Sequence, residues 1–124
     1  MDIITQHYII SRDLNAHGNL FGGTVLAWLD EAGAIYIIDK TGYSNIVTVS
    51  MHDVNFRNPG KMGNIVKIYG EIMKKGKSSI TVRVDAVNET PGCEKRVIID
   101  CTITYVFLDN SGKPYPFFDI NKDA

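Results

Sequence analysis

The chain has 124 residues, with 13 basic and 14 acidic side chains and a formal net charge of −1. This length fits one domain with its own hydrophobic core, and we expect residues 1–124 to form that single domain. The balanced charge argues against nucleic acid or an anionic membrane as a main partner.

The N-terminal segment and the cysteines predict a cytoplasmic protein. Residues 1–7 contain an acid where a secretory signal has basic residues, and no long apolar run follows them. Cys93 stands in a predicted turn and Cys101 in a predicted strand, without the spacing of a disulfide framework or of metal ligands. We therefore expect two free thiols and a cytoplasmic location.

A first strand is expected from Ile3 to Ile10, followed by a glycine-rich segment at residues 15–24. Gly22 and Gly23 stand directly before the next predicted helix. Glycines there let a ligand approach unpaired N–H groups, where the helix dipole favours negative charge. The segment therefore indicates a site for a phosphate or a developing oxyanion. Close packing of the helix on a sheet explains the two glycines about equally well.

A helix is expected from Thr24 to Ile38, apolar on nearly every side except at Asp30 and Glu31. A helix that is apolar all round is usually buried, and an isolated buried carboxylate is unfavourable unless something compensates it. Asp30 is therefore expected either to join a structural network or to be held for chemistry. For Glu31 we favour an ion pair at a subunit interface over a share in the chemistry.

The position of Asp30 also bears on assembly. Asp30 lies roughly 10 Å along the helix from its start, given a rise of about 1.5 Å per residue. The glycine amides of its own chain are therefore rather far away. A second helix running antiparallel beside the first would bring Asp30 of one subunit near the glycines of the other. If the acid and the amides serve one reaction, this geometry favours a dimer.

After residue 42 the apolar residues no longer recur with a helical period and instead alternate with polar residues. Half-buried strands are expected around residues 66–72, 80–86 and 97–107. An earlier and less regular run, Ile46 to Phe56, is interpreted as a strand covered on both faces. Short turns separate these runs, and short turns cannot form parallel crossovers, so the sheet should be antiparallel.

The predicted fold class is therefore α+β, with one long helix against one curved antiparallel sheet. The core is expected to span about residues 3–108, followed by a C-terminal tail, residues 109–124. The tail carries an aromatic cluster at residues 115–118. We expect this cluster to pack on the chain itself, with a partner subunit or a pocket as the other possible contacts.

A set of residues at fixed spacing carries a family resemblance. It comprises Asn15, Gly18, Phe21-Gly22-Gly23, Asp30-Glu31-Ala32-Gly33, Val47-Thr48-Val49 and Phe56-x-x-Pro59. Its most specific parts are the fifteen-residue offset from Asn15 to Asp30 and the turn Lys75-Gly76-Lys77-Ser78-Ser79. The set resembles the hotdog-fold acyl-CoA thioesterases over about residues 10–108, above all the bacterial short- to medium-chain and brain-type acyl-CoA hydrolases.

The resemblance implies a hotdog fold, in which a five- to six-stranded antiparallel sheet wraps one long central helix. It implies homodimers whose sheets join edge to edge and which assemble further into tetramers or hexamers. The implied reaction is hydrolysis of acyl-CoA to a free fatty acid and coenzyme A. This reaction needs no metal and no organic cofactor, since a thioester carbonyl is already electrophilic. Coenzyme A is part of the substrate and product.

The resemblance also assigns roles to residues. Asp30 would act as general base or nucleophile, and Asn15 from the opposing subunit would position the water or the carbonyl. The Gly23 amide would bind the oxyanion, and the Thr48 hydroxyl would assist. Substrate binding would fall to a set of glycines, cations and hydroxyls, namely Gly22, Arg57, Lys75, Gly76, Lys77, Ser78 and Ser79.

Two other functions stay open at this stage. A hotdog dehydratase acting on an acyl thioester would pair an acid with a histidine, but His17 and His52 form no hydration motif. A non-catalytic acyl-CoA-binding sensor or subunit would need no buried acid. The sequence contains no nucleophile elbow around a serine, and its three histidines have no metal-site spacing.

Overall fold

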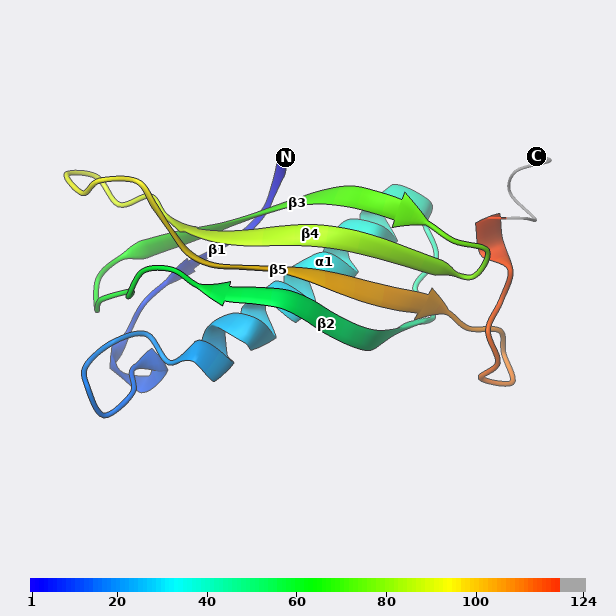
Figure 1. Ribbon diagram of the computed structural model, residues 1–124, viewed down its shortest axis with the longest axis horizontal. Helices are drawn as coiled ribbons and strands as arrows, with labels where there is room; N and C mark the ends of the chain where they lie inside the picture. The colour runs from blue at the N-terminus through cyan, green and yellow to red at the C-terminus, as the bar shows by residue number, and fades with distance from the viewer. Residues whose placement is uncertain (119–124) are drawn as a thin grey trace.

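One long helix lies across one face of a five-stranded antiparallel sheet in the computed structural model, which describes residues 1–118 (Figure 1). The elements in chain order are β1 (Asp2–Tyr8), a short 3-10 helix η1 (Ser11–Asp13), α1 (Gly22–Thr41), β2 (Ile46–Phe56), β3 (Ile65–Lys75), β4 (Ser79–Asn88) and β5 (Arg96–Phe107). The strand order is β1-β3-β4-β5-β2, so β1 and β2 are the edges. The predicted α+β class and the antiparallel sheet around one helix are confirmed.

Helix α1 is longer than the sequence pattern indicated, because glycines set both of its ends. It begins at Gly22, two residues before the expected start, and runs to Thr41. Gly42 then adopts a left-handed backbone with φ of 72°, and its N–H donates to the Ile38 carbonyl at 2.8 Å. This is the usual way in which a glycine ends a helix.

The described residues contain no helix that combines the length and hydrophobicity required to span a bilayer.

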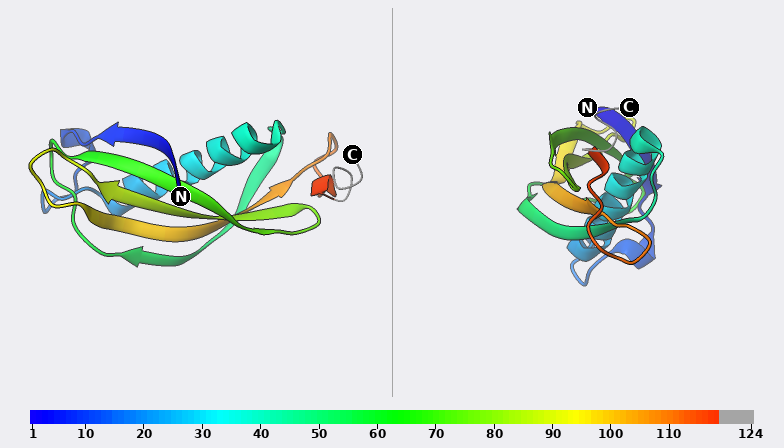
Figure 2. Two further views of the ribbon diagram at one scale, coloured as in Figure 1. Left: turned by 90° about the horizontal axis from the view of Figure 1, so that it is seen from above. Right: turned by 90° about the vertical axis from the view of Figure 1, so that its right-hand side faces the viewer.

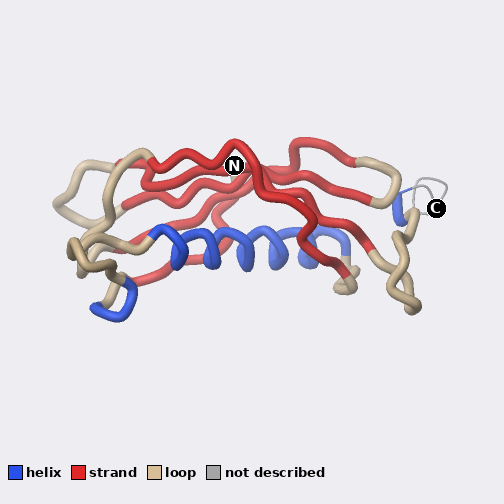
Figure 3. Tube along the Cα trace, turned by 60° about the horizontal axis from the view of Figure 1, so that its bottom comes forward, coloured by secondary structure: helices blue, strands red, loops and turns tan. Residues whose placement is uncertain are grey.

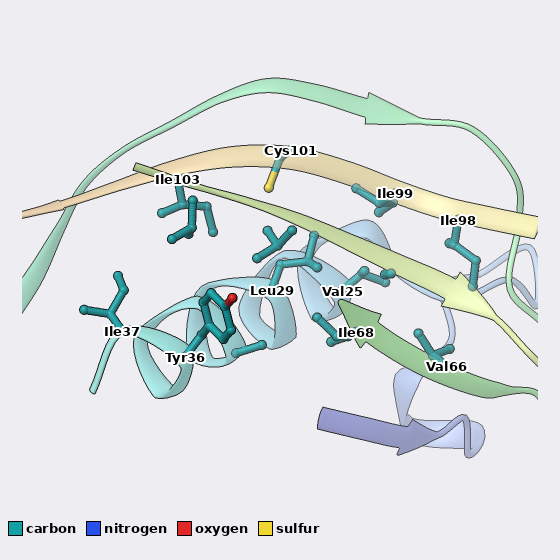
Figure 4. Packing of buried hydrophobic residues seen from close by; sticks show 14 of the residues in the cluster. Val25, Leu29, Tyr36, Ile37, Val66, Ile68, Ile98, Ile99, Cys101 and Ile103 are labelled. Atoms are coloured by element: carbon teal, nitrogen blue, oxygen red, sulfur yellow. The ribbon is translucent and has the colours of Figure 1, made fainter. Parts of the chain in front are cut away.

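The core lies between α1 and the inner face of the sheet. Figure 4 shows Val25, Leu29 and Ile37 of α1 pointing toward Ile68 of β3 and Ile103 of β5. All five are fully buried, and each contributes about 1.5–3 kcal/mol by leaving water. The alternation predicted for β3, β4 and β5 is confirmed, since their inward residues form this core.

The expectation that α1 is buried all round is wrong for the single chain. The sheet covers one side of the helix, and no other described element lies on the opposite side (Figures 2 and 3). Phe21 just before the helix is therefore 52% exposed and Ile35 is 37% exposed. Glu31 is exposed, and Asp30 lies between the two sides and is half-buried.

Strand β2 also differs from the expectation, because it is an edge strand and is not covered on both faces. Most of its side chains are exposed, among them Val47 and Val49. Its irregular pattern arises from two register shifts against β5, one between Thr48 and Ser50 and one between His52 and Asn55. Each shift interrupts the alternation and redirects the side chains that follow it.

The described part of the tail, residues 109–118, packs on the chain itself as expected. The Tyr43 ring contacts the rings of Phe107, Tyr115 and Phe117. The Tyr43 hydroxyl donates a hydrogen bond to the Leu108 carbonyl. The remaining tail residues, 119–124, lie outside the described part of the chain.

Candidate active site

The Asp30 side chain is held by two hydroxyl groups from the sheet. The Thr48 hydroxyl donates to Asp30 Oδ1 at 2.7 Å. The Tyr105 hydroxyl donates to the Asp30 backbone carbonyl at 2.7 Å and also lies 3.2 Å from Oδ1. Thr48 on β2 and Tyr105 on β5 are directly paired neighbours. Two adjacent strands thus fix one carboxylate oxygen, while Oδ2 has no partner among the described residues.

Tyr105 is the member of this group that sequence reasoning missed. Alternation identified it only as a strand residue, because the pattern does not say which helical residue a strand side chain meets. A signal was present, since a buried tyrosine hydroxyl usually has a hydrogen-bond partner. Burial raises the pKa of Tyr105, and the nearby Asp30 charge raises it further. The hydroxyl therefore keeps its proton and can donate it to a hydrogen bond.

The two glycines at the start of α1 lie close to two exposed phenylalanine rings, and their amides are uncapped. A Cβ at Gly22 would lie 2.8 Å from the Phe56 ring, and a Cβ at Gly23 would overlap the Phe21 ring. Phe21 is the N-cap residue and no side chain within residues 1–118 caps the helix. The first N–H groups of the helix are thus available to an acceptor from outside the chain.

Asn15 lies in a tight turn ahead of α1, and its side-chain oxygen closes that turn. Asn15 Oδ1 accepts hydrogen bonds from the backbone N–H groups of His17 at 3.0 Å and Asn19 at 3.1 Å. The Nδ2 group is consequently left as a donor. Asn15, Gly22 and Arg57 line one cavity of about 360 Å³, so three of the predicted site residues lie together at this end of α1.

Arg57 is anchored by a buried acid that sequence reasoning treated only as a polar strand position. Its guanidinium forms an ion pair with Asp100, which also accepts a hydrogen bond from Asn55 Nδ2 at 3.1 Å. Burial alone would raise the pKa of Asp100. The hydrogen bonds from Arg57 and Asn55 and the charges of Arg57 and Arg83 outweigh burial and lower this pKa below its ordinary value of 3.8.

The predicted coenzyme A cluster, residues 75–79, forms the hairpin between β3 and β4. The Gly76 N–H donates to the Ser79 carbonyl at 2.8 Å and closes the turn. The Lys75 ammonium lies 5.5 Å from the centre of the Phe118 ring, beside a groove of about 520 Å³ that also includes Lys40. The hairpin lies at the end of the molecule where α1 finishes, far from the start of α1 (Figures 1 and 2).

The structure thus divides the predicted site residues into three groups. Asp30 and Thr48 are in contact at the middle of α1. Asn15, Gly22 and Arg57 gather near its start, next to Gly23. The hairpin formed by Lys75, Gly76, Lys77, Ser78 and Ser79 lies at the opposite end. Helix α1 carries members of the first two groups, Gly22 at its first position and Asp30 near its middle.

The histidines and cysteines differ in their surroundings. His7 stacks on Trp28 with 4.2 Å between ring centres, while His17 and His52 are exposed. Cys93 is exposed and Cys101 is buried, and both are free thiols, as predicted. Within residues 1–118, no three His, Cys, Asp or Glu side chains are grouped so that they could hold a metal ion.

Comparison with known proteins gives one consistent result. The family model "Thioesterase superfamily" matches residues 17–95. A Haemophilus influenzae protein named as an uncharacterized acyl-CoA thioester hydrolase is 34% identical over 115 residues, which cover 90% of this chain and 74% of that protein.

Two solved structures are similar over nearly the whole chain. One is Cj0915 of Campylobacter jejuni, described as a hexameric hotdog fold thioesterase. It has a TM-score of 0.86 and 29% identity, covering 99% of this chain and 95% of that one. The other is HI0827, described as a hexameric broad specificity acyl-coenzyme A thioesterase. It has a TM-score of 0.86 and 28% identity, covering 93% of this chain and 85% of that one.

The pair formed by Arg57 and Asp100 predicts a pH dependence of stability. Because the pKa of Asp100 is lowered on folding, its contribution is fully present above pH 3.8 and is lost as the pH falls below that value. We expect Asp100→Asn to lower the free energy of unfolding by about 1–3 kcal/mol at pH 7 and by much less at pH 3. Urea denaturation at both pH values measures this difference, with Asp39→Asn as an exposed control. A difference that is equal at both pH values would contradict the assignment.

Proposed function

This chain belongs to the thioesterase superfamily, and from that membership we propose that it hydrolyses acyl-CoA to a free fatty acid and coenzyme A. Asp30 is the proposed catalytic residue. The observation that carries this proposal is the geometry of its carboxylate. Thr48 fixes the carboxylate through Oδ1, and Oδ2 has no partner within residues 1–118. A fixed carboxylate that keeps one oxygen without a hydrogen bond is suited to take a proton from water or to attack a carbonyl carbon.

The proposed reaction follows from the chemistry of a thioester. As a general base, Asp30 takes a proton from water while the water oxygen bonds to the carbonyl carbon. As a nucleophile, its carboxylate attacks that carbon first, and water then hydrolyses the anhydride. In both routes the carbonyl oxygen becomes an oxyanion, the C–S bond breaks, and coenzyme A leaves as a thiolate that is then protonated. A thioester carbonyl is already electrophilic, so the proposed reaction calls for no metal or organic cofactor.

The Gly23 amide is the proposed donor to the oxyanion. Uncapped N–H groups at a helix start and the dipole of α1 both favour negative charge there. Gly23 precedes Asp30 by seven residues, however, which corresponds to roughly 10 Å along the helix axis. One substrate carbonyl cannot contact both groups of the same chain.

A second copy of the chain resolves this separation, so the proposed site forms in a homodimer. With the two α1 helices antiparallel, Asp30 of one subunit faces Gly23 and Asn15 of the partner subunit. The Asn15 Nδ2 donor would then orient the attacking water or the thioester carbonyl. Dimers are proposed to assemble further, as a tetramer or a hexamer, and the hexameric descriptions of the two solved structures favour the hexamer.

The exposed apolar surface supports this association. Phe21 and Ile35 beside the uncovered side of α1, and Val47 and Val49 on edge strand β2, are between 37% and 54% exposed. Full burial of one such side chain from a fully exposed state gains about 1.5–3 kcal/mol, so each of these has roughly half of that left to gain. Two subunits contribute eight such side chains, so the gain is comparable to the cost of association, about 4–15 kcal/mol. The unpaired backbone of β2 also lets two sheets join edge to edge.

Coenzyme A is proposed to lie across the dimer, between the hairpin of one subunit and the start of α1 in the other. The same antiparallel arrangement that joins Asp30 to Gly23 brings the end of one α1 toward the start of the second. Lys75 and Lys77 would bind phosphate groups, with Ser78 and Ser79 as further donors and Gly76 allowing close approach. Gly22 and Arg57 would contact coenzyme A from the partner subunit.

The cytoplasmic location of the protein stays a prediction.

Thiol release from acyl-CoA tests the role of Asp30. We expect Asp30→Asn to remain folded and to lower kcat by about 10²–10⁴-fold, because the amide can neither accept the proton nor attack the carbonyl. Acetyl-, butyryl-, hexanoyl-, decanoyl- and palmitoyl-CoA serve as substrates and also reveal the chain-length preference. Asp39→Asn, at an exposed position of the same helix, is the control. A folded Asp30→Asn protein with unchanged kcat would contradict the proposed mechanism.

The role of the hairpin predicts a substrate-dependent defect. Lys75→Ala combined with Lys77→Ala should raise KM for acyl-CoA roughly 3- to 30-fold, given up to about 1 kcal/mol for each exposed charge contact. The same variant should keep its KM for the matching acyl N-acetylcysteamine thioester, which lacks the nucleotide. Lys95→Ala with Lys113→Ala, two exposed lysines on other loops, is the matched control. Equal defects on both substrates would refute nucleotide binding at the hairpin.

A further inference from the structure

We propose that Tyr105 is a positioning residue that fixes the orientation of the Asp30 carboxylate, so that Oδ2 is the oxygen that meets water or the thioester carbonyl. This inference deepens the proposed function and rests on it. Its basis is the hydroxyl of Tyr105, which lies 2.7 Å from the Asp30 carbonyl and 3.2 Å from Asp30 Oδ1. One group of the sheet thus contacts both the backbone and the side chain of the same residue.

The contact with the backbone fixes where Asp30 stands. Tyr105 is 1% exposed and lies on β5, between neighbouring strands β4 and β2. Its ring is therefore held by packing, and its hydroxyl ties one turn of α1 to the sheet. A displacement of that turn along the sheet would break the hydrogen bond to the Asp30 carbonyl. The hydrogen bond consequently fixes the position of Asp30 relative to the sheet.

The contact with the side chain fixes which oxygen is free. A carboxylate rotates readily about its last bond, and the two oxygens are equivalent unless their partners differ. Here both hydroxyls, from Thr48 and Tyr105, lie on the Oδ1 side. Oδ2 has no partner within residues 1–118. The two hydroxyls together therefore keep one defined oxygen available for chemistry.

Gly33 provides the space that this arrangement requires. A Cβ at position 33 would overlap the Tyr105 hydroxyl and approach the ring carbon that bears it to 3.0 Å. Glycine inside a helix costs about 1 kcal/mol relative to alanine. In α1 the missing side chain of Gly33 leaves room for the tyrosine hydroxyl to reach the Asp30 carbonyl. Asp30 stands three residues earlier on the same face of the helix. The contact of Tyr105 with Asp30 therefore depends on glycine at position 33.

Hydroxyl–carboxylate pairs elsewhere in the chain supply a matched comparison. The Tyr69 hydroxyl on β3 donates to Glu89 Oε1 at 2.5 Å, at a cluster that also contains Lys67 and Lys95. This pair is built from the same chemical groups and makes no contact with Asp30. Loss of the Tyr69 hydroxyl therefore reports the structural effect of losing such a pair without an effect on Asp30.

The test compares Tyr105→Phe with Tyr69→Phe in the full-length protein, using steady-state hydrolysis of one acyl-CoA and thermal unfolding. We expect Tyr105→Phe to lower kcat roughly tenfold and to change KM less than twofold, since the ring and the substrate contacts remain. Tyr69→Phe should keep wild-type kcat. A Tyr105→Phe protein with wild-type kcat, or one in which only KM changes, would overturn the proposal.

A second variant keeps the test decisive if Tyr105→Phe does not fold. Gly33→Ala retains the hydroxyl but displaces it, and it should also lower kcat roughly tenfold at constant KM. Wild-type kcat in Gly33→Ala, or failure of both variants to fold, would assign the pair to stability alone and overturn the proposal. Asp30→Asn is measured alongside. If that variant is active, the proposed mechanism fails; if it is inactive while Tyr105→Phe is fully active, only the present inference fails.

Discussion

Helix α1 has apolar residues on every side, but the sheet of its own chain covers only one of them. Leu29 and Ile37 are fully buried against the sheet, whereas Ile35 on the other side is 37% exposed. The hydrophobic effect therefore stabilises the helix in the chain and also favours a second cover from outside it. The carboxylate of Asp30 lies at the border between these two environments. Its half-buried position explains how a charged group can be tolerated in such a helix and still reach a substrate.

The same constraint accounts for the separation of the candidate site residues. The glycine amides stand at the start of α1 and Asp30 near its middle. The lysine hairpin lies at the end of the molecule where α1 finishes (Figure 1). A rigid helix cannot fold back to join its own ends. Two antiparallel copies bring unlike ends together, and symmetry then produces two equivalent sites per dimer. In the proposed function, the exposed apolar surface and the divided site are therefore two consequences of one arrangement.

Much of this arrangement could be predicted from the sequence, and the failures have physical reasons. The change from helical to alternating period gave the element order, and Asp30 stood out because it breaks an apolar pattern. β2 was misread because two bulges imitate the irregularity of a strand covered on both faces. Tyr105 and Asp100 were missed because alternation gives the face of a strand and not the partner across it. The roles of Asn15, Gly23 and Thr48 stay predictions.

In the proposed function Asp30 and Asn15 serve one site from two different subunits, and mixed oligomers can show whether they do. Asp30→Asn and Asn15→Ala chains, each inactive alone, would be co-expressed in equal amounts and assayed for acyl-CoA hydrolysis. With random mixing, a site receives both intact residues about one time in four, so we expect about one quarter of wild-type activity. A mixture no more active than either variant alone would contradict it.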